Sequence, residues 1–146
     1  MIKSLYIMGI NNLGEYLKKL TYEHIIFYKR VEELENLLET NPLNAIEVST
    51  HFLENVVFPH MVKEEKTVIP VIPNKAGERE KILIEELSKE HEEMEKLYES
   101  FRKSLSNGKI TDAAAQLKKI LTLLKLHSKK EESLFEFILK RYLEEK

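Results

Sequence analysis

The sequence predicts an all-α protein, an up-down-up-down antiparallel four-helix bundle that forms a single domain over residues 1–146. Two observations support this prediction. Apolar residues recur at alternating spacings of three and four through four long segments, which is typical of helices with one buried face. The connections between these segments are short, so consecutive helices should be antiparallel neighbours. A chain of this length can bury a core without disulfides.

The first helix is expected to begin at Asn12, because Asn12 and Glu15 form a capping pattern. Residues 1–11 would then be an N-terminal arm. The apolar strip from Leu5 to Ile10 within this arm is a candidate dimer contact, so we expect a monomer or a homodimer. The core stripe of the helix comprises Leu13, Leu17, Leu20, His24, Phe27, Val31, Leu34 and Leu38.

The second helix is expected to open at Asn41-Pro42 or at Asn44 and to run to about Pro70. Pro59 lies inside it, where a proline removes a backbone hydrogen bond at a cost of about 3 kcal/mol. A kink or bulge there would aim the next residue, and a break without functional meaning is the alternative. The core stripe comprises Ile46, Leu53, Val56 or Val57, His60, Glu64 and Val68.

The third and fourth helices follow a longer link at residues 71–77. The third covers about residues 78–106, and Asn107-Gly108 ends it as a left-handed cap. Its stripe comprises Ile84, Leu87, His91, Met94, Tyr98, Phe101 and Leu105. The fourth starts near Thr111 and follows Leu117, Leu124, His127, Glu131, Leu134, Ile138 and Tyr142.

A pattern of histidine and glutamate occurs twice along these stripes. A lone histidine is followed, 36 residues later, by a histidine with a glutamate four positions on: His24, His60 and Glu64, then His91, His127 and Glu131. Each histidine lies 16 residues from the loop of its own helical hairpin, at residues 40–44 or 107–111, or roughly 24 Å at a rise of about 1.5 Å per residue. We therefore expect all four in one layer, with each glutamate on the same face as its histidine.

Four imidazoles and two carboxylates in one buried layer predict a metal site. Left unpaired, each buried polar group costs about 1–3 kcal/mol; a hydrogen-bonded histidine–glutamate network without metal is the alternative. The donor set suits iron, manganese or zinc. Its two-fold symmetry indicates two ions, each with two nitrogens and with shared oxygens from Glu64 and Glu131. A solvent-derived bridge would leave one position open on each ion, which favours iron over its possible substitutes, manganese and zinc.

Other polar residues near this layer are expected to play smaller parts. We expect His51 to face away from the layer, at the surface or between helices, and Glu65, Glu95 and Glu132 to face solvent. The alternatives are that Glu132 replaces Glu131 as a ligand and that Glu95 approaches the layer. Glu23 and Glu90 are candidate acceptors for imidazole N–H groups. Their contribution should be weak, because each adjoins a layer histidine and neighbouring helical positions point about 100° apart.

Composition excludes several classes of function. The chain has no cysteine, which removes thiolate metal sites and cysteine nucleophiles. Its 23 basic and 25 acidic residues are interleaved, so we expect no nucleic-acid partner. It has no glycine-rich phosphate loop. The apolar run at the amino terminus is too short for a signal peptide or a membrane span, so we expect a cytoplasmic protein without membrane contact.

With its histidines and glutamates in this order, the chain resembles a hemerythrin-like (HHE cation-binding) domain over nearly all of its length. The resemblance implies a non-haem centre of two iron ions with carboxylate and oxo or hydroxo bridges, which binds dioxygen, nitric oxide or peroxide. One departure is informative. Oxygen-carrying hemerythrins have His-x-x-x-His on the third helix, whereas here His91 is followed by Glu95, which argues against reversible oxygen carriage.

The set of four histidines and two glutamates is closer to the di-iron domains of iron–sulfur cluster repair proteins and to the iron-sensing domain of certain ubiquitin-ligase subunits. The cysteine-bearing domain of the former and the ligase module of the latter have no counterpart here. We therefore expect a non-enzymatic di-iron protein that binds dioxygen or nitric oxide, or senses or stores iron. A redox enzyme acting on peroxide or nitric oxide, an iron–sulfur repair function, and a structural bundle with a vestigial site are the alternatives.

Overall fold

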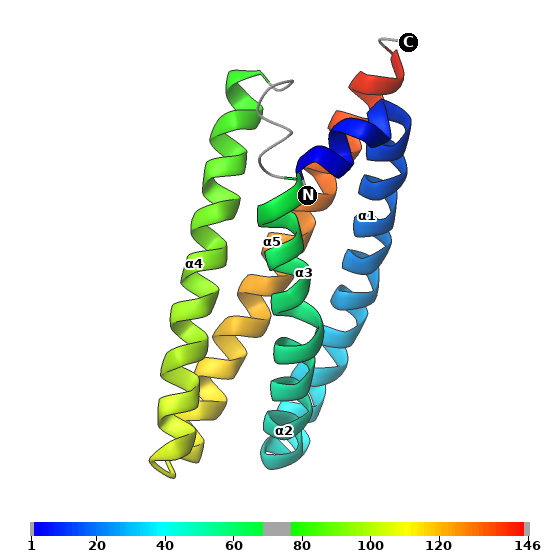
Figure 1. Ribbon diagram of the computed structural model, residues 1–146. Coiled ribbons are helices and arrows are strands. Elements are labelled where there is room, and N and C mark those ends of the chain that lie inside the picture. Colours follow the sequence, from blue (N-terminus) through cyan, green and yellow to red (C-terminus); the bar gives the residue numbers. More distant parts are fainter. Residues whose placement is uncertain (1, 69–76, 145–146) are drawn as a thin grey trace.

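Four antiparallel helical segments form a bundle in the computed structural model, which describes residues 2–68 and 77–144 (Figure 1). The first segment is α1 (Ile2–Thr40), and the last two are α4 (Glu78–Ser106) and α5 (Ile110–Glu144). The second is one continuous helical path made of α2 (Pro42–Phe52), η1 (Leu53–Val57), α3 (Phe58–Lys63) and η2 (Glu64–Val68). The predicted all-α four-helix bundle is confirmed.

Helix α1 begins ten residues before its predicted start. The prediction of a cap at Asn12 and of an arm over residues 1–11 is wrong for residues 2–11, which are helical. Asn12 and Gly9 lower helix propensity by no more than about 1 kcal/mol each, and no proline precedes them. The helix therefore continues through both. The side chains of the predicted dimer strip, Leu5 to Ile10, lie outside the described part of the structure.

The second helical path starts where the sequence predicts. The Asn41 side chain caps it by accepting a hydrogen bond from the Asn44 backbone N–H at 3.3 Å, and Pro42 occupies the first turn. The path is described as far as Val68, so the predicted end at Pro70 and the link after it lie outside the described residues.

Two turns of this path are π-helical, at η1 and η2. At the end of η1 the Phe58 N–H bonds the carbonyl of Leu53, five residues back. Pro59 follows directly and has no N–H to donate, and its ring would crowd the carbonyl four residues earlier in a regular α-helix. The wider turn relieves this conflict, so the bulge expected at Pro59 is present.

The hairpin between α4 and α5 forms at the predicted glycine. Gly108 has a φ of 71°, the left-handed conformation that a helix C-cap requires. The Gly108 and Lys109 N–H groups bond the carbonyls of Leu105 and Ser104 at 3.0 and 2.9 Å. These bonds satisfy the last carbonyls of α4 and reverse the chain into α5.

The buried side chains form two apolar clusters with polar groups between them. The cluster nearer the hairpin loops contains Phe27, Val31, Met94, Phe101, Leu117 and Leu124 among others. The second cluster comprises Leu17, Leu20, Ile84, Leu87, Leu134, Phe135 and Ile138. On α1, α4 and α5 the change from one cluster to the other falls at the predicted histidine layer, as between Leu20, His24 and Phe27 on α1. The fold therefore places this layer deep in the bundle.

We predict that Leu117→Ala lowers the free energy of unfolding by about 2–5 kcal/mol, the usual cost of emptying a fully buried leucine site. Leu117 is 0% exposed and packs in the cluster near the hairpin loops. Leu126→Ala on the same helix is the control, because Leu126 is 55% exposed, and it should change stability by no more than about 0.5 kcal/mol. Urea unfolding of metal-free protein measures both; equal losses would contradict the described orientation of α5.

Candidate metal centre

All six residues of the predicted site lie together in the interior. They come from all four helical segments, and each is at most 6% exposed: His24, His60, Glu64, His91, His127 and Glu131. Their ligand-type atoms fall into two compact sets. We call these the first triad (His24, His60 and Glu64) and the second triad (His91, His127 and Glu131).

Within each triad the two imidazoles meet through their Nε2 atoms. The Nε2 atoms of His24 and His60 are 3.0 Å apart, and those of His91 and His127 are 2.8 Å apart. Two nitrogens that each lie about 2.1 Å from one ion are about 3 Å apart when they subtend a right angle. The spacing therefore fits a pair of imidazoles that share one ion.

The glutamates lie beside these nitrogens, and Glu131 also approaches the other triad. Glu64 Oε1 is 3.0 Å from His60 Nε2, and Glu131 Oε1 is 2.6 Å from His127 Nε2. Glu131 Oε1 also lies 3.6 Å from the Nε2 of His24, in the other triad. A carboxylate in that position faces both triads, as a bridging ligand must.

The glutamate oxygens have no adequate protein partners among the described residues. Both oxygens of Glu64 and the Oε2 of Glu131 are buried without a hydrogen bond. Leaving buried carboxylate oxygens unsatisfied costs more than leaving neutral groups, because the charge is desolvated. A metal-free hydrogen-bonded network therefore does not account for this layer, whereas cations between the triads would supply the missing charge.

Three of the four histidines donate a hydrogen bond from their outer nitrogen, Nδ1, to a carboxylate. The Nδ1 of His60 lies 2.5 Å from Glu23, that of His91 lies 2.7 Å from Glu65, and that of His127 lies 2.9 Å from Glu90. Glu90 also accepts a hydrogen bond from Lys130 at 2.7 Å. A carboxylate at Nδ1 keeps the proton there, so the Nε2 lone pair is left facing the interior.

These carboxylates correct three sequence predictions. Glu65 was expected to face solvent only, but although 41% exposed it bonds His91. Glu23 and Glu90 were expected to contribute weakly, because each diverges from the histidine next to it. Each instead serves a histidine on the neighbouring helix, His60 and His127 respectively. The repeated Glu-His dipeptide at Glu23 and Glu90 was the available signal.

Of the other polar residues expected to lie outside the layer, two are exposed and one is half-buried. His51 is exposed, and its side chain contacts Asn55 on its own helix. Glu95 is exposed too, at the edge of the site. Glu132 is half-buried, and it does not accept a hydrogen bond from His24, since the Nδ1 of His24 has no partner in the described structure.

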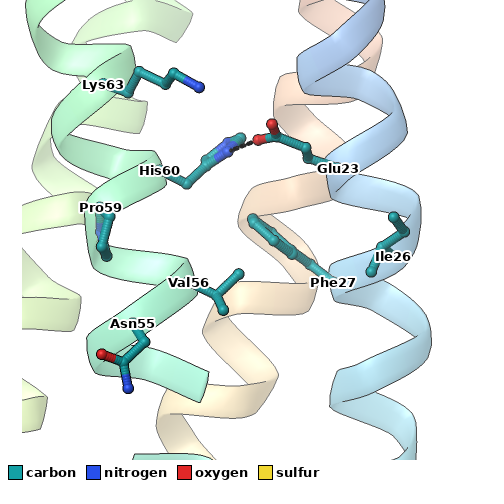
Figure 2. A pocket seen from close by; sticks show the side chains of 8 residues that line it. All are labelled: Glu23, Ile26, Phe27, Asn55, Val56, Pro59, His60 and Lys63. Carbon is teal, nitrogen blue, oxygen red and sulfur yellow. Dashed lines mark hydrogen bonds and ion pairs between the residues drawn. The ribbon is translucent and has the colours of Figure 1, made fainter. Parts of the chain in front are cut away.

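Two pockets reach the outer side of the layer. One, of about 530 Å³, lies between α1 and the second helical path; His60 and Glu23 meet in its wall, with Phe27, Val56 and Pro59 below them (Figure 2). The other, of about 280 Å³, lies between that path and α4 and is lined by His91, Glu65 and Glu95 among others. The imidazoles thus separate these pockets from the interior of the layer.

Burial and mutual charge set the protonation of the histidines. Burial, followed by the charges of His60, His127 and His91, lowers the pKa of His24 to about 3. Burial and the charge of His127 also lower the pKa of His91, against the pull of Glu64 and Glu65. Burial lowers the pKa of His60 as well, but the nearby carboxylates of Glu64 and Glu23 outweigh this and raise the pKa above its ordinary value. His24 and His91 are therefore neutral near pH 7, as metal ligands must be.

An all-α bundle whose four helices aim imidazoles and unpaired carboxylates at one buried layer defines a cation-binding helical bundle. The family model described as the hemerythrin HHE cation binding domain matches residues 16–138, a range that includes all six residues of the two triads. The chain belongs to this family. No curated protein and no solved structure matches this chain. Among the described helices, none combines the length and apolar character needed to cross a membrane.

We predict that the metal-free protein loses stability in acid partly through His24. In the unfolded chain His24 binds a proton below about pH 6.5, whereas in the folded protein its pKa is about 3. The unfolded state therefore binds more protons in this window, and the free energy of unfolding falls as pH falls. His60, with its raised pKa, acts in the opposite sense and loses its contribution as pH rises.

Replacing His24 with alanine should flatten the fall in stability between about pH 6.5 and 4 by up to about 1.4 kcal/mol per pH unit. His51→Ala is the matched control, since His51 is exposed and outside the layer. Urea unfolding across this pH range in chelator measures the slope. An unchanged slope in His24→Ala would mean that His24 does not stay neutral in the folded protein.

Proposed function

We propose that the chain is a metal-binding protein that holds two iron ions inside the bundle, one at each triad. The observation that carries the proposal is the pairing of two imidazole Nε2 atoms, about 3 Å apart, with buried unpaired carboxylate oxygens in each half. The donor set of nitrogen and oxygen suits iron, with manganese or zinc as substitutes. His24 and His60 with Glu64 would hold one ion, and His91 and His127 with Glu131 the other.

When bound, the iron pair supplies redox-active Lewis-acid positions for a small ligand. The chain's own residues orient the site and keep it dry. Glu23, Glu65 and Glu90 hold the rings of three histidines by their outer nitrogens. Phe27 and Phe135 pack against the ring of His24. We propose that the protein binds dioxygen or nitric oxide at this centre, or senses or stores the iron itself.

We predict about two iron ions per chain after anaerobic loading with ferrous iron, and an absorption shoulder in the near ultraviolet after oxidation, from a bridged diferric centre. Glu64→Ala and Glu131→Ala should each lower the bound iron, because each removes a buried carboxylate from a triad. His51→Ala should retain both ions. Metal analysis of the desalted proteins gives the ratio. Wild-type protein with one ion or none would refute the two-ion centre.

The same sample separates the proposal from its alternatives. Sustained consumption of peroxide or nitric oxide by the loaded protein, with a suitable electron donor, would favour a redox enzyme. Stoichiometric binding without turnover supports a binding or sensing protein. Absence of metal under all loading conditions would favour a structural bundle with a vestigial site.

We predict that metal removal lowers the melting temperature at neutral pH. Metal that binds only the folded state stabilises it by about 2.7 kcal/mol at a concentration one hundred times its dissociation constant. Protein treated with chelator loses this stabilisation. Both oxygens of Glu64 and one of Glu131 are then buried without a cation or a hydrogen bond. Melting curves with and without chelator, on protein shown to contain metal, measure the shift. The shift should shrink as pH falls toward 5, where protons displace metal from imidazole. Coincident curves at neutral pH would leave the centre without a role in stability.

A further inference from the structure

The outer nitrogens of the layer histidines break the two-fold symmetry of the repeat. Residues 67 positions apart are equivalent, so the Glu23–His60 pair corresponds to the Glu90–His127 pair. By the same relation, the bond from His91 to Glu65 has a counterpart that would join His24 to Glu132. Together, the two halves of the repeat therefore contain the residues for four carboxylate–imidazole pairs.

Only three of these pairs are present in the described structure. The Nδ1 of His24 is buried with no hydrogen-bond partner, although His24 is only 2% exposed. Its equivalent, His91, has Glu65 at 2.7 Å. The second triad thus has a carboxylate behind both of its imidazoles, and the first triad has one behind His60 alone.

The surroundings of the triads differ in the same direction. The Phe135 ring stacks on His24 with ring centroids 5.8 Å apart, and Phe27 meets the ring of His60 edge-on at 4.8 Å. The position equivalent to Phe27 in the other half is occupied by Met94. Aromatic rings offer no strong acceptor for the His24 N–H.

We propose that the two metal positions are inequivalent and that the second triad binds its ion more tightly than the first. This inference rests on the proposed two-ion centre. An acceptor on the outer nitrogen fixes the imidazole and strengthens it as a ligand, and loss of such an acceptor typically costs 10–100-fold in metal affinity. Glu65 is thus a positioning residue that acts through His91. The chain then loads in two steps and has a stable form with one ion, held by α4 and α5.

Variants with one triad disabled test the inequality directly. Stepwise binding to wild type is not decisive, because two neighbouring cations repel each other even at identical positions. His24→Ala leaves the second triad complete, and His91→Ala leaves the first. Titrated anaerobically with Co²⁺ and followed by calorimetry and visible absorption, each should bind one ion. The affinity of His24→Ala should be about 10–100-fold higher than that of His91→Ala. Equal or reversed affinities would overturn the inference.

The carboxylates provide matched second substitutions. Glu65→Gln in the His24→Ala protein should weaken Co²⁺ binding by about 10–100-fold. Glu132→Gln in the His91→Ala protein should leave it unchanged, since the His24 nitrogen has no partner. If Glu132→Gln weakens binding as much as Glu65→Gln does, the fourth pair forms on loading and the positions are equivalent. Circular dichroism of the metal-free variants verifies that each is folded; should Glu65→Gln unfold, Glu65→Ala replaces it.

The number of Co²⁺ ions bound per wild-type chain distinguishes a failure of the two-ion centre from a failure of the inequality between its two positions. Fewer than two Co²⁺ ions per wild-type chain would contradict the proposed two-ion centre, and the inference would fall with it. Two ions in wild type, together with equal affinities in His24→Ala and His91→Ala, would contradict the inequality alone.

Discussion

The bundle depends on a single constraint, which is that six polar groups with ligand chemistry are buried at one level of an apolar interior. Taking imidazoles and carboxylates out of water is unfavourable unless each polar atom gains a partner. The chain meets this demand on the outer side of the layer, where three carboxylates accept from imidazole Nδ1 atoms. On the inner side, the oxygens of Glu64 and one oxygen of Glu131 have no partner among the described groups. That imbalance makes the layer a candidate site for cations.

The backbone departs from a regular α-helix near the layer. The second helical path contains the layer residues His60 and Glu64, and it is the path interrupted by π-helical turns. One such turn precedes Pro59, whose missing N–H explains it. The other begins at Glu64 itself, where no proline or glycine is present. Isolated π-turns concentrate at functional sites, and here the turn lies where a carboxylate is held against two imidazoles.

The repeated spacing was sufficient to predict the fold and the layer. Periodicity places His24, His60 and His127 on core stripes, and equal distances from the loops place them at one height. The partners of their outer nitrogens were harder to foresee. Reasoning along one helix shows that Glu23 diverges from His24, but only packing between helices shows that it meets His60. The early start of α1 was missed because Gly9 and Asn12 disfavour a helix only weakly. The π-turn at Glu64 was missed because no proline or glycine marks it.

The position of the layer between two apolar clusters also bears on how the helices are aligned. Apolar stripes of leucine and isoleucine pack nearly as well after one helix slides by a turn, about 5.4 Å. A slide of that size would bury the polar groups of one helix against hydrocarbon on its neighbours, such as Phe27 or Leu87. Buried polar residues are known to specify register in helical assemblies in this way. The layer that makes this chain a candidate metal protein therefore also selects one alignment of its four helices over the staggered alternatives.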